Sequence, residues 1–80
     1  MLVTSPHQLA ITVRNQRKQM QISQADVADR VGLRQETISA FENKADRTKL
    51  DTLFRILAAL NLEIHVVPQG TKVSGWDKEW

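Results

Sequence analysis

The sequence predicts a mostly α-helical bundle that is followed by one short β-strand and a polar tail. Apolar residues recur at helical spacing in four successive segments between residues 5 and 61. Three of these segments begin with a hydroxyl residue suited to an N-cap, namely Ser5, Ser23 and Thr48. After residue 61 the apolar residues alternate with a period of two, which is typical of a strand.

The first helix is predicted from residue 5 to about residue 20. Ser5 is its N-cap, Pro6 suits the first helical position, and Gln8 completes a capping box. A loose apolar stripe follows, formed by Leu9, Ala10, Ile11, Val13 and Met20.

The second and third helices are separated by a tight turn. Ser23 and Asp26 form the capping box that starts the second helix, which runs to about residue 31. Gly32 marks the turn, where a positive φ costs free energy for any residue with a Cβ. The third helix runs from about residue 34 or 35 to residue 42. The two helices share a predicted core of Val27, Val31, Leu33, Ile38 and Phe41.

These two helices have the pattern of a helix-turn-helix. Ala28 is small where the helices pass closely, Gly32 follows four residues later, and β-branched Ile38 comes six residues after that. A plain helical hairpin is the alternative, but it does not need polar Gln24 and Gln35 at both helix starts. In a helix-turn-helix the second helix directs its outer side chains at base edges in the major groove. The sequence therefore favours a sequence-specific DNA-binding protein.

The expected roles on DNA follow from this geometry. Gln24 and the amides at the start of the second helix are expected to hold a phosphate. Arg34 suits guanine or a phosphate, Gln35 suits adenine, and Glu36 suits the amino group of cytosine. The helix-turn-helix itself is not basic, so further phosphate contacts are expected from the first helix and from basic residues after the motif. The predicted DNA-contacting residues are Gln24, Arg34, Gln35, Glu36, Thr37, Ser39, Ala40, Asn43, Lys44 and Arg47.

A fourth helix follows the polar loop of residues 43–47. Thr48 and Asp51 are predicted to form its capping box, and Asn61 can end it in a left-handed conformation. Between them lies the clearest amphipathic pattern in the chain, formed by Leu50, Leu53, Phe54, Ile56, Leu57 and Leu60.

Residues 62–68 are predicted to form a strand that pairs with a second copy of the chain. Leu62, Ile64 and Val66 lie on one face, and Pro68 ends the segment. A lone strand leaves its backbone unsatisfied, and the sequence contains no evident second strand. The economical solution is a homodimer with a two-fold axis between identical strands. The alternative is an extended segment that packs on the helices.

Residues 69–80 are predicted to be a flexible tail that binds a partner. The segment is polar, yet it contains both tryptophans of the chain, Trp76 and Trp80. Tryptophan is enriched in interface hot spots, and a C-terminal indole beside a carboxylate suits capture in a pocket. The alternative is a tail that folds back on its own dimer.

Composition limits the remaining classes of function. The 80 residues suffice for one small domain, which gains stability from oligomerisation, and they include no cysteine. His7 and His65 lie far apart with no neighbouring His or Cys, and no serine has a His/Asp pair, so no metal, cofactor or enzyme is predicted. Because no apolar run approaches membrane-spanning length and no signal peptide is evident, we expect a cytoplasmic protein associated with the nucleoid.

Four stretches of the chain resemble the Xre/lambda-repressor-like helix-turn-helix family. They are Ser23–Ala28, Gly32–Ser39, Glu42–Asn43 and Leu50–Leu53, within a similarity that covers about residues 8–61. The resemblance implies a lambda-repressor-like bundle of four to five helices and a dimer on a palindromic operator. The expected organisation is a DNA-binding domain at residues 1–61, a dimerisation strand at 62–68 and a tail at 69–80.

Within that family the chain resembles HipB-type antitoxins. The similarity lies in Arg34–Asn43, in the strand after Leu60–Leu62 and in the closing Glu79–Trp80. It implies a dimer held by an intermolecular strand pair, repression of its own operon, and neutralisation of a HipA-type serine/threonine kinase toxin on which the tail docks. Glu36 departs from the Ala or Gln common in related proteins, so the operator sequence cannot be transferred.

Two other functions fit parts of the sequence. A stand-alone phage-type or restriction-modification controller repressor would share the DNA-binding half but have no partner for the tail. A protein-binding adaptor would use the fold without DNA, and would lack the steep salt dependence of a phosphate-binding protein.

Overall fold

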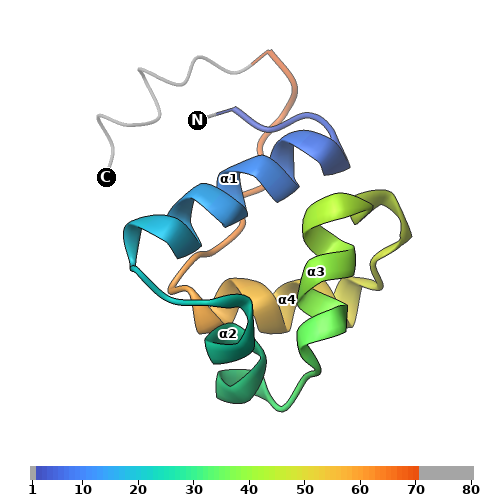
Figure 1. Cartoon of the computed structure of the whole chain (residues 1–80). Coiled ribbons are helices and arrows are strands. Elements are labelled where there is room, and N and C mark those ends of the chain that lie inside the picture. Colours follow the sequence, from blue (N-terminus) through green and yellow to red (C-terminus); the bar gives the residue numbers. More distant parts are fainter. Residues whose placement is uncertain (1, 71–80) are drawn as a thin grey trace.

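The computed structural model describes residues 2–70 and forms a small helical bundle (Figure 1). Its helices are α1 (Pro6–Gln19), α2 (Gln24–Val31), α3 (Gln35–Asn43), the 3-10 helix η1 (Ala45–Arg47) and α4 (Leu50–Ala59). α2 packs against α3 and α4, while α1 packs against α3 and η1. The predicted helical bundle is therefore confirmed, with one short 3-10 turn in the loop between α3 and α4.

Two of the three predicted capping boxes differ in the structure. The box at α2 is complete, because Ser23 Oγ accepts from the N–H of Asp26 and the Asp26 carboxylate accepts from the N–H of Ser23, both at 3.0 Å. At α1, Ser5 caps Gln8 as predicted, but the Gln8 Oε1 accepts from the N–H of Thr4 at 2.8 Å.

The capping box predicted at Thr48 and Asp51 is wrong. Helix α4 takes Lys49 as its N-cap, with no side-chain cap hydrogen bond. Thr48 instead ends η1, where its backbone N–H donates to the Ala45 carbonyl at 3.0 Å. The turn at η1 thus places Thr48 one residue too early to cap α4.

Left-handed residues end three of the helices. Gly32 has φ of +69° and follows α2, and Asn61 has φ of +57° after α4, both as predicted. Gln21 adopts φ of +59° after α1, which the sequence did not indicate. Its N–H donates to the Lys18 carbonyl at 3.0 Å and so helps to close the helix.

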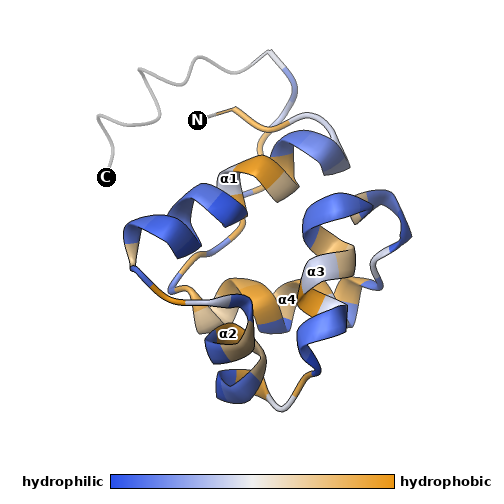
Figure 2. Ribbon diagram, viewed as in Figure 1, coloured by the Kyte–Doolittle hydropathy of each residue, from blue (hydrophilic) through white to orange (hydrophobic). Residues whose placement is uncertain are grey.

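The core lies where the four helices meet, and Figure 2 shows their apolar stretches around the centre of the bundle. Not all of the predicted apolar stripes take part: Ile11, Leu50 and Phe54 are 45%, 71% and 55% exposed. The buried core residues are Ala10, Val13, Val27, Ala28, Ile38, Phe41, Leu53, Ile56, Leu57, Ala59 and Leu60.

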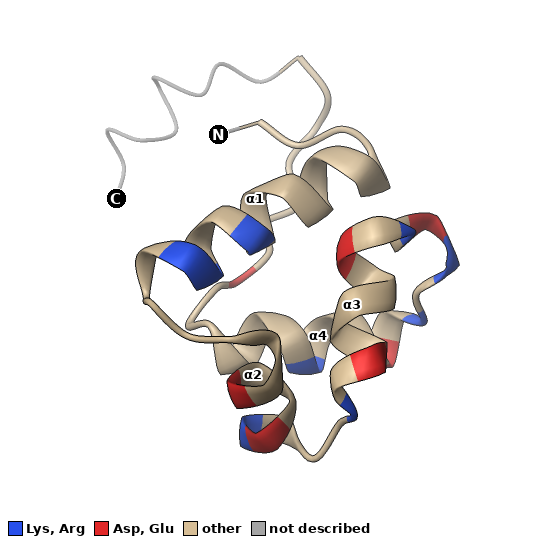
Figure 3. Cartoon of the chain, viewed as in Figure 1, with Lys and Arg blue, Asp and Glu red and all other residues tan. Residues whose placement is uncertain are grey.

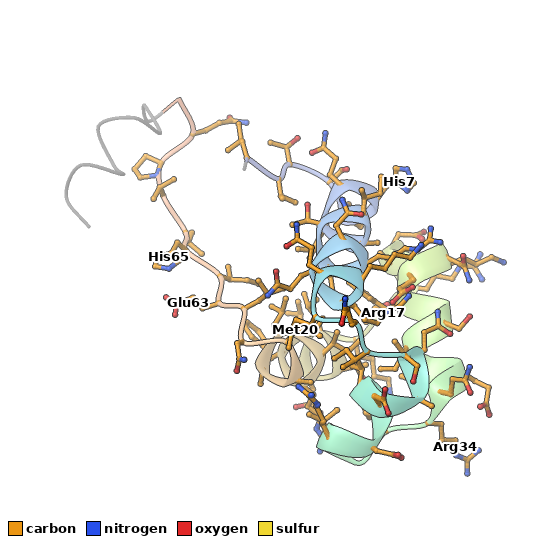
Figure 4. The ribbon with its side chains drawn as sticks, turned by 60° about the vertical axis from the view of Figure 1, so that its left-hand side comes forward. His7, Arg17, Met20, Arg34, Glu63 and His65 are labelled. Atoms are coloured by element: carbon orange, nitrogen blue, oxygen red, sulfur yellow. The ribbon has the colours of Figure 1, made fainter. Side chains whose placement is uncertain are left out.

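The segment after α4 has no partner strand within residues 2–70. Leu62 packs against the core, but Ile64 and Val66 are exposed, Val66 to 92%. Figure 4 shows this segment standing apart from the helices. An intermolecular strand pair needs a second copy, so it stays a prediction. Trp76 and Trp80 lie outside the described residues.

No helix in the described part of the chain has both the length and the apolar character needed to cross a membrane.

Candidate nucleic-acid interface

Helix α3 divides cleanly into a buried side and an outer side. Ile38 and Phe41 are each 1% exposed and anchor the helix against the core. The predicted contact residues on its other side are exposed or half-buried: Arg34, Gln35, Glu36, Ala40, Asn43 and Lys44 are exposed, and Thr37 and Ser39 are half-buried. Arg47, in η1, is exposed as well. One helix therefore brings most of the predicted DNA-contacting residues to one surface.

The start of α3 suits close approach to a ligand. Arg34 is its N-cap, with an extended backbone, and Figure 4 shows its side chain directed away from the bundle. Further along the helix, the Asn43 amide donates to Ser39 Oγ at 3.3 Å. This hydrogen bond orders two of the predicted contact residues relative to each other.

A partly buried polar cluster connects α1, α2 and α3. Arg17 forms a two-pronged ion pair with Glu42, with Nε 2.8 Å from Oε2 and Nη2 3.1 Å from Oε1. The Gln24 amide also donates to Glu42 Oε1, at 3.1 Å. A further Arg17 N–H donates to the Ile22 carbonyl at 3.0 Å. Only 11% of the Arg17 side chain and 5% of the Glu42 side chain are exposed.

This cluster was not predicted from the sequence. Arg17 belongs to the basic residues of the first helix that were expected near phosphates, but its guanidinium is engaged inside the protein. A signal was available, because Ala10, Val13 and Arg17 share one helical face, and Ile38 and Glu42 share another. A cation and an anion at such inward positions indicate a buried pair.

The cluster keeps Glu42 ionised. Burial alone would raise the pKa of this carboxyl, but hydrogen bonds from Arg17 and Gln24 and the charges of Arg17 and Arg14 outweigh it and lower the pKa below its usual value. Arg14 Nε lies 3.9 Å from Glu42 Oε1 and remains 55% exposed. The pKa of Asp26 is also lowered, chiefly because the backbone N–H of Ser23 donates to its carboxylate.

Basic residues surround the candidate interface rather than fill it. Figure 3 shows Lys and Arg on α1, just before α3 and in the loop that follows α3. Acidic residues lie on α2 and α3 themselves, including Glu36 on the outer side of α3. Among residues 2–70 no cluster of three or more His, Cys, Asp or Glu side chains is placed to hold a metal ion.

Comparison with known proteins places this geometry among DNA-binding antitoxins. The chain matches the family model described as helix-turn-helix over residues 13–67. It is 42% identical over 62 residues to antitoxin HipB of Escherichia coli K12. This match covers 78% of this chain and 70% of that protein. Antitoxin HipB of E. coli O6:H1 strain CFT073 is also 42% identical over 62 residues, and the match covers 78% of this chain and 66% of that protein. Antitoxin HigA1 of Mycobacterium tuberculosis H37Rv is 40% identical over 65 residues, covering 78% of this chain and 44% of that protein.

Solved structures give the same picture. A chain in the HipA-HipB-O2-O3 complex superposes with a TM-score of 0.84 at 38% identity, over 86% of this chain and 97% of that chain. A chain in the HipB-O4 20mer complex matches with the same values. The fold described above is therefore shared with chains in the HipA-HipB-O2-O3 complex and in the HipB-O4 20mer complex.

Proposed function

Because this chain belongs to the Xre-like helix-turn-helix family and, within it, to the HipB antitoxins, we propose that it is a DNA-binding transcriptional repressor. It represses its own operon and serves as the antitoxin of a HipA-type serine/threonine kinase. The protein acts in the cytoplasm, bound to the nucleoid through its operator.

One observation carries the DNA-binding part of this proposal. The outer side of α3 presents Arg34, Gln35 and Glu36 at its first turn, while Ile38 and Phe41 fix the helix from behind. A rigid helix with polar side chains at its N-terminal end is what a helix-turn-helix inserts into the major groove. Glu36 repels phosphates, so it is suited to a base edge and not to the backbone.

Each predicted contact residue has a role in this proposal. Arg34 binds guanine, Gln35 binds adenine, and Glu36 accepts from the amino group of cytosine. Gln24 holds a phosphate at the start of α2. The remaining side chains contact the base edges or the backbone at the margins of α3, and these are Thr37, Ser39, Ala40, Asn43, Lys44 and Arg47.

The functional unit is a homodimer on a palindrome. Leu62, Ile64 and Val66 pair with the same residues of a second copy, and the exposure of Ile64 and Val66 is consistent with that role. Dimer symmetry places the two α3 helices about 34 to 36 Å apart, one turn of the duplex. Trp76 and Trp80 bind the kinase.

Selection from a randomised duplex pool tests the DNA-binding proposal. The expected result is a palindromic site, on which Gln35→Ala costs about 1–3 kcal/mol of binding and relaxes specificity at one base position. An equal loss on the selected site and on a scrambled duplex would make Gln35 a positioning contact. A pool that yields no enriched sequence, together with a shallow salt dependence, would contradict DNA recognition and favour the adaptor.

Capture from a lysate of the source cell tests the kinase partner. The full chain is compared with a version that ends at Pro68, and retained proteins are identified by mass spectrometry. We expect a kinase with the full chain, held less well or not at all by the shortened version. Retention of DNA with no kinase by either version would favour the stand-alone repressor.

A further inference from the structure

The side-chain amide of Gln24 binds the carboxylate of Glu42, and that carboxylate is itself bound by Arg17. Gln24 is the first residue of α2 and half-buried, and its Nε2 donates to Glu42 Oε1 at 3.1 Å. Glu42 cannot turn away, because Arg17 binds both of its oxygens, at 2.8 and 3.1 Å. An arginine on α1 thus fixes an anion on α3, and that anion fixes an amide at the start of α2.

The chemistry of the pair sets the orientation of the Gln24 amide. An ionised carboxylate only accepts hydrogen bonds, so the amide must turn its nitrogen, and not its oxygen, toward Glu42. The nitrogen carries two hydrogens, and Glu42 takes one of them. The other N–H remains on the same side of the amide, and it is the donor with which Gln24 can bind a phosphate.

We propose that Glu42 is a positioning residue for DNA binding, which holds the Gln24 amide with its second N–H available to a phosphate. Without the carboxylate the amide is free to rotate by half a turn, which would present its oxygen to the phosphate and repel it. This inference rests on the proposed DNA-binding function. It predicts that Glu42 affects DNA affinity although its side chain is only 5% exposed.

The sign of the effect separates positioning from simple electrostatics. Glu42→Gln removes a negative charge, so long-range attraction to DNA alone would make the variant bind more tightly. The positioning role predicts the opposite, because the new amide can both donate and accept and no longer dictates the orientation of Gln24. Asp29→Asn, at an exposed position of α2, removes the same charge and is the matched control.

The experiment measures binding of the full chain to a 24-base-pair duplex of arbitrary sequence at low salt. A phosphate contact carries no sequence information, so the operator is not required. All variants are compared well below their unfolding temperatures. We expect Glu42→Gln to weaken binding about five- to tenfold, since one hydrogen bond to a charged group is impaired. Asp29→Asn should bind as tightly as the wild type or more tightly.

A double-mutant cycle distinguishes positioning of the Gln24 amide by Glu42 from a merely structural role of Glu42. In a Gln24→Leu background, Glu42→Gln should cause no further loss, because the amide that it positions is gone. Equal losses in both backgrounds, or tighter binding by Glu42→Gln alone, would overturn the positioning role. A wild-type chain that binds no duplex would instead contradict the proposed function itself.

A measurement on the wild type covers the case in which Glu42→Gln does not fold. The two Nε2 hydrogens of Gln24 give separate NMR resonances, as in any glutamine, because rotation about the amide C–N bond is slow. Only one of these resonances should shift strongly when the duplex is added. Two resonances that shift together would overturn the inference.

Discussion

Glu42 is the residue on which both the helical packing and the candidate interface depend. It joins Arg17 on α1 and Gln24 on α2 to its own helix, α3. Glu42→Ala leaves a guanidinium that is 11% exposed without its counter-ion. We expect this variant to lose about 3–5 kcal/mol of the free energy of unfolding, as for other broken buried pairs.

Glu42→Gln should lose less stability, about 1–3 kcal/mol, because its amide oxygen still accepts from Arg17. Urea denaturation of the two variants beside the wild type checks the order. If Glu42→Ala is within about 0.5 kcal/mol of the wild type, the cluster contributes nothing to the fold.

The same carboxyl should make stability depend on acid pH. Its pKa is lower in the folded chain than the usual value for a glutamate in an unfolded chain. A depressed folded pKa stabilises the protein fully above the unfolded pKa, and this stabilisation is lost as the pH falls through the folded pKa. The stability gap between wild type and Glu42→Gln should therefore narrow when denaturation is repeated below about pH 4. A gap of constant size down to pH 3 would exclude Glu42 as the titrating group.

The helix ends offer a matched test of which caps are real. Ser23 caps α2 with its hydroxyl, whereas Thr48, also expected to cap a helix, uses only its backbone N–H at the end of η1. Ser23→Ala should cost about 1 kcal/mol of stability, while Thr48→Ala should stay within about 0.5 kcal/mol of the wild type. Thermal unfolding of both variants decides the matter, and equal losses would contradict the assignment of the caps.

Local signals in the sequence predicted the positions of the helices well, although only one of the three predicted capping boxes is complete. Gly32 and Asn61 have the positive φ expected of them. The exposed Leu50 and Phe54 show the limit of this reasoning. Helical spacing marks an apolar stripe, but which of two adjacent stripes faces the core depends on the other helices. The pair of Arg17 and Glu42 was missed for the same reason, since 25 residues separate its members.

The way in which two copies of the chain pair is a property of the whole molecule. It stays a prediction, because the structure contains one chain. Val66 is 92% exposed, so a charge there should not disturb the fold of the chain. Val66→Asp places a charge opposite the apolar Leu62 of the second copy in the predicted antiparallel strand pair, and it should weaken dimerisation. Analytical ultracentrifugation measures the effect, with Gln69→Asp, beyond the strand, as the control. Equal dimer dissociation constants for the two variants would argue against the strand as the interface.

The outer side of α3 could be predicted in advance, since its polar residues are those left over once Ile38 and Phe41 are assigned to the core. The spacing between two such helices depends on the dimer, and it can be measured on DNA.

The most direct measurement is the affinity of the full chain for its selected palindrome with and without five base pairs inserted at the centre. Two α3 helices one duplex turn apart require both half-sites on one face of the duplex. The insertion rotates one half-site to the opposite face, so affinity should fall to that for a scrambled duplex. Undiminished affinity for the lengthened site would contradict recognition by a dimer that inserts α3 into two successive major grooves.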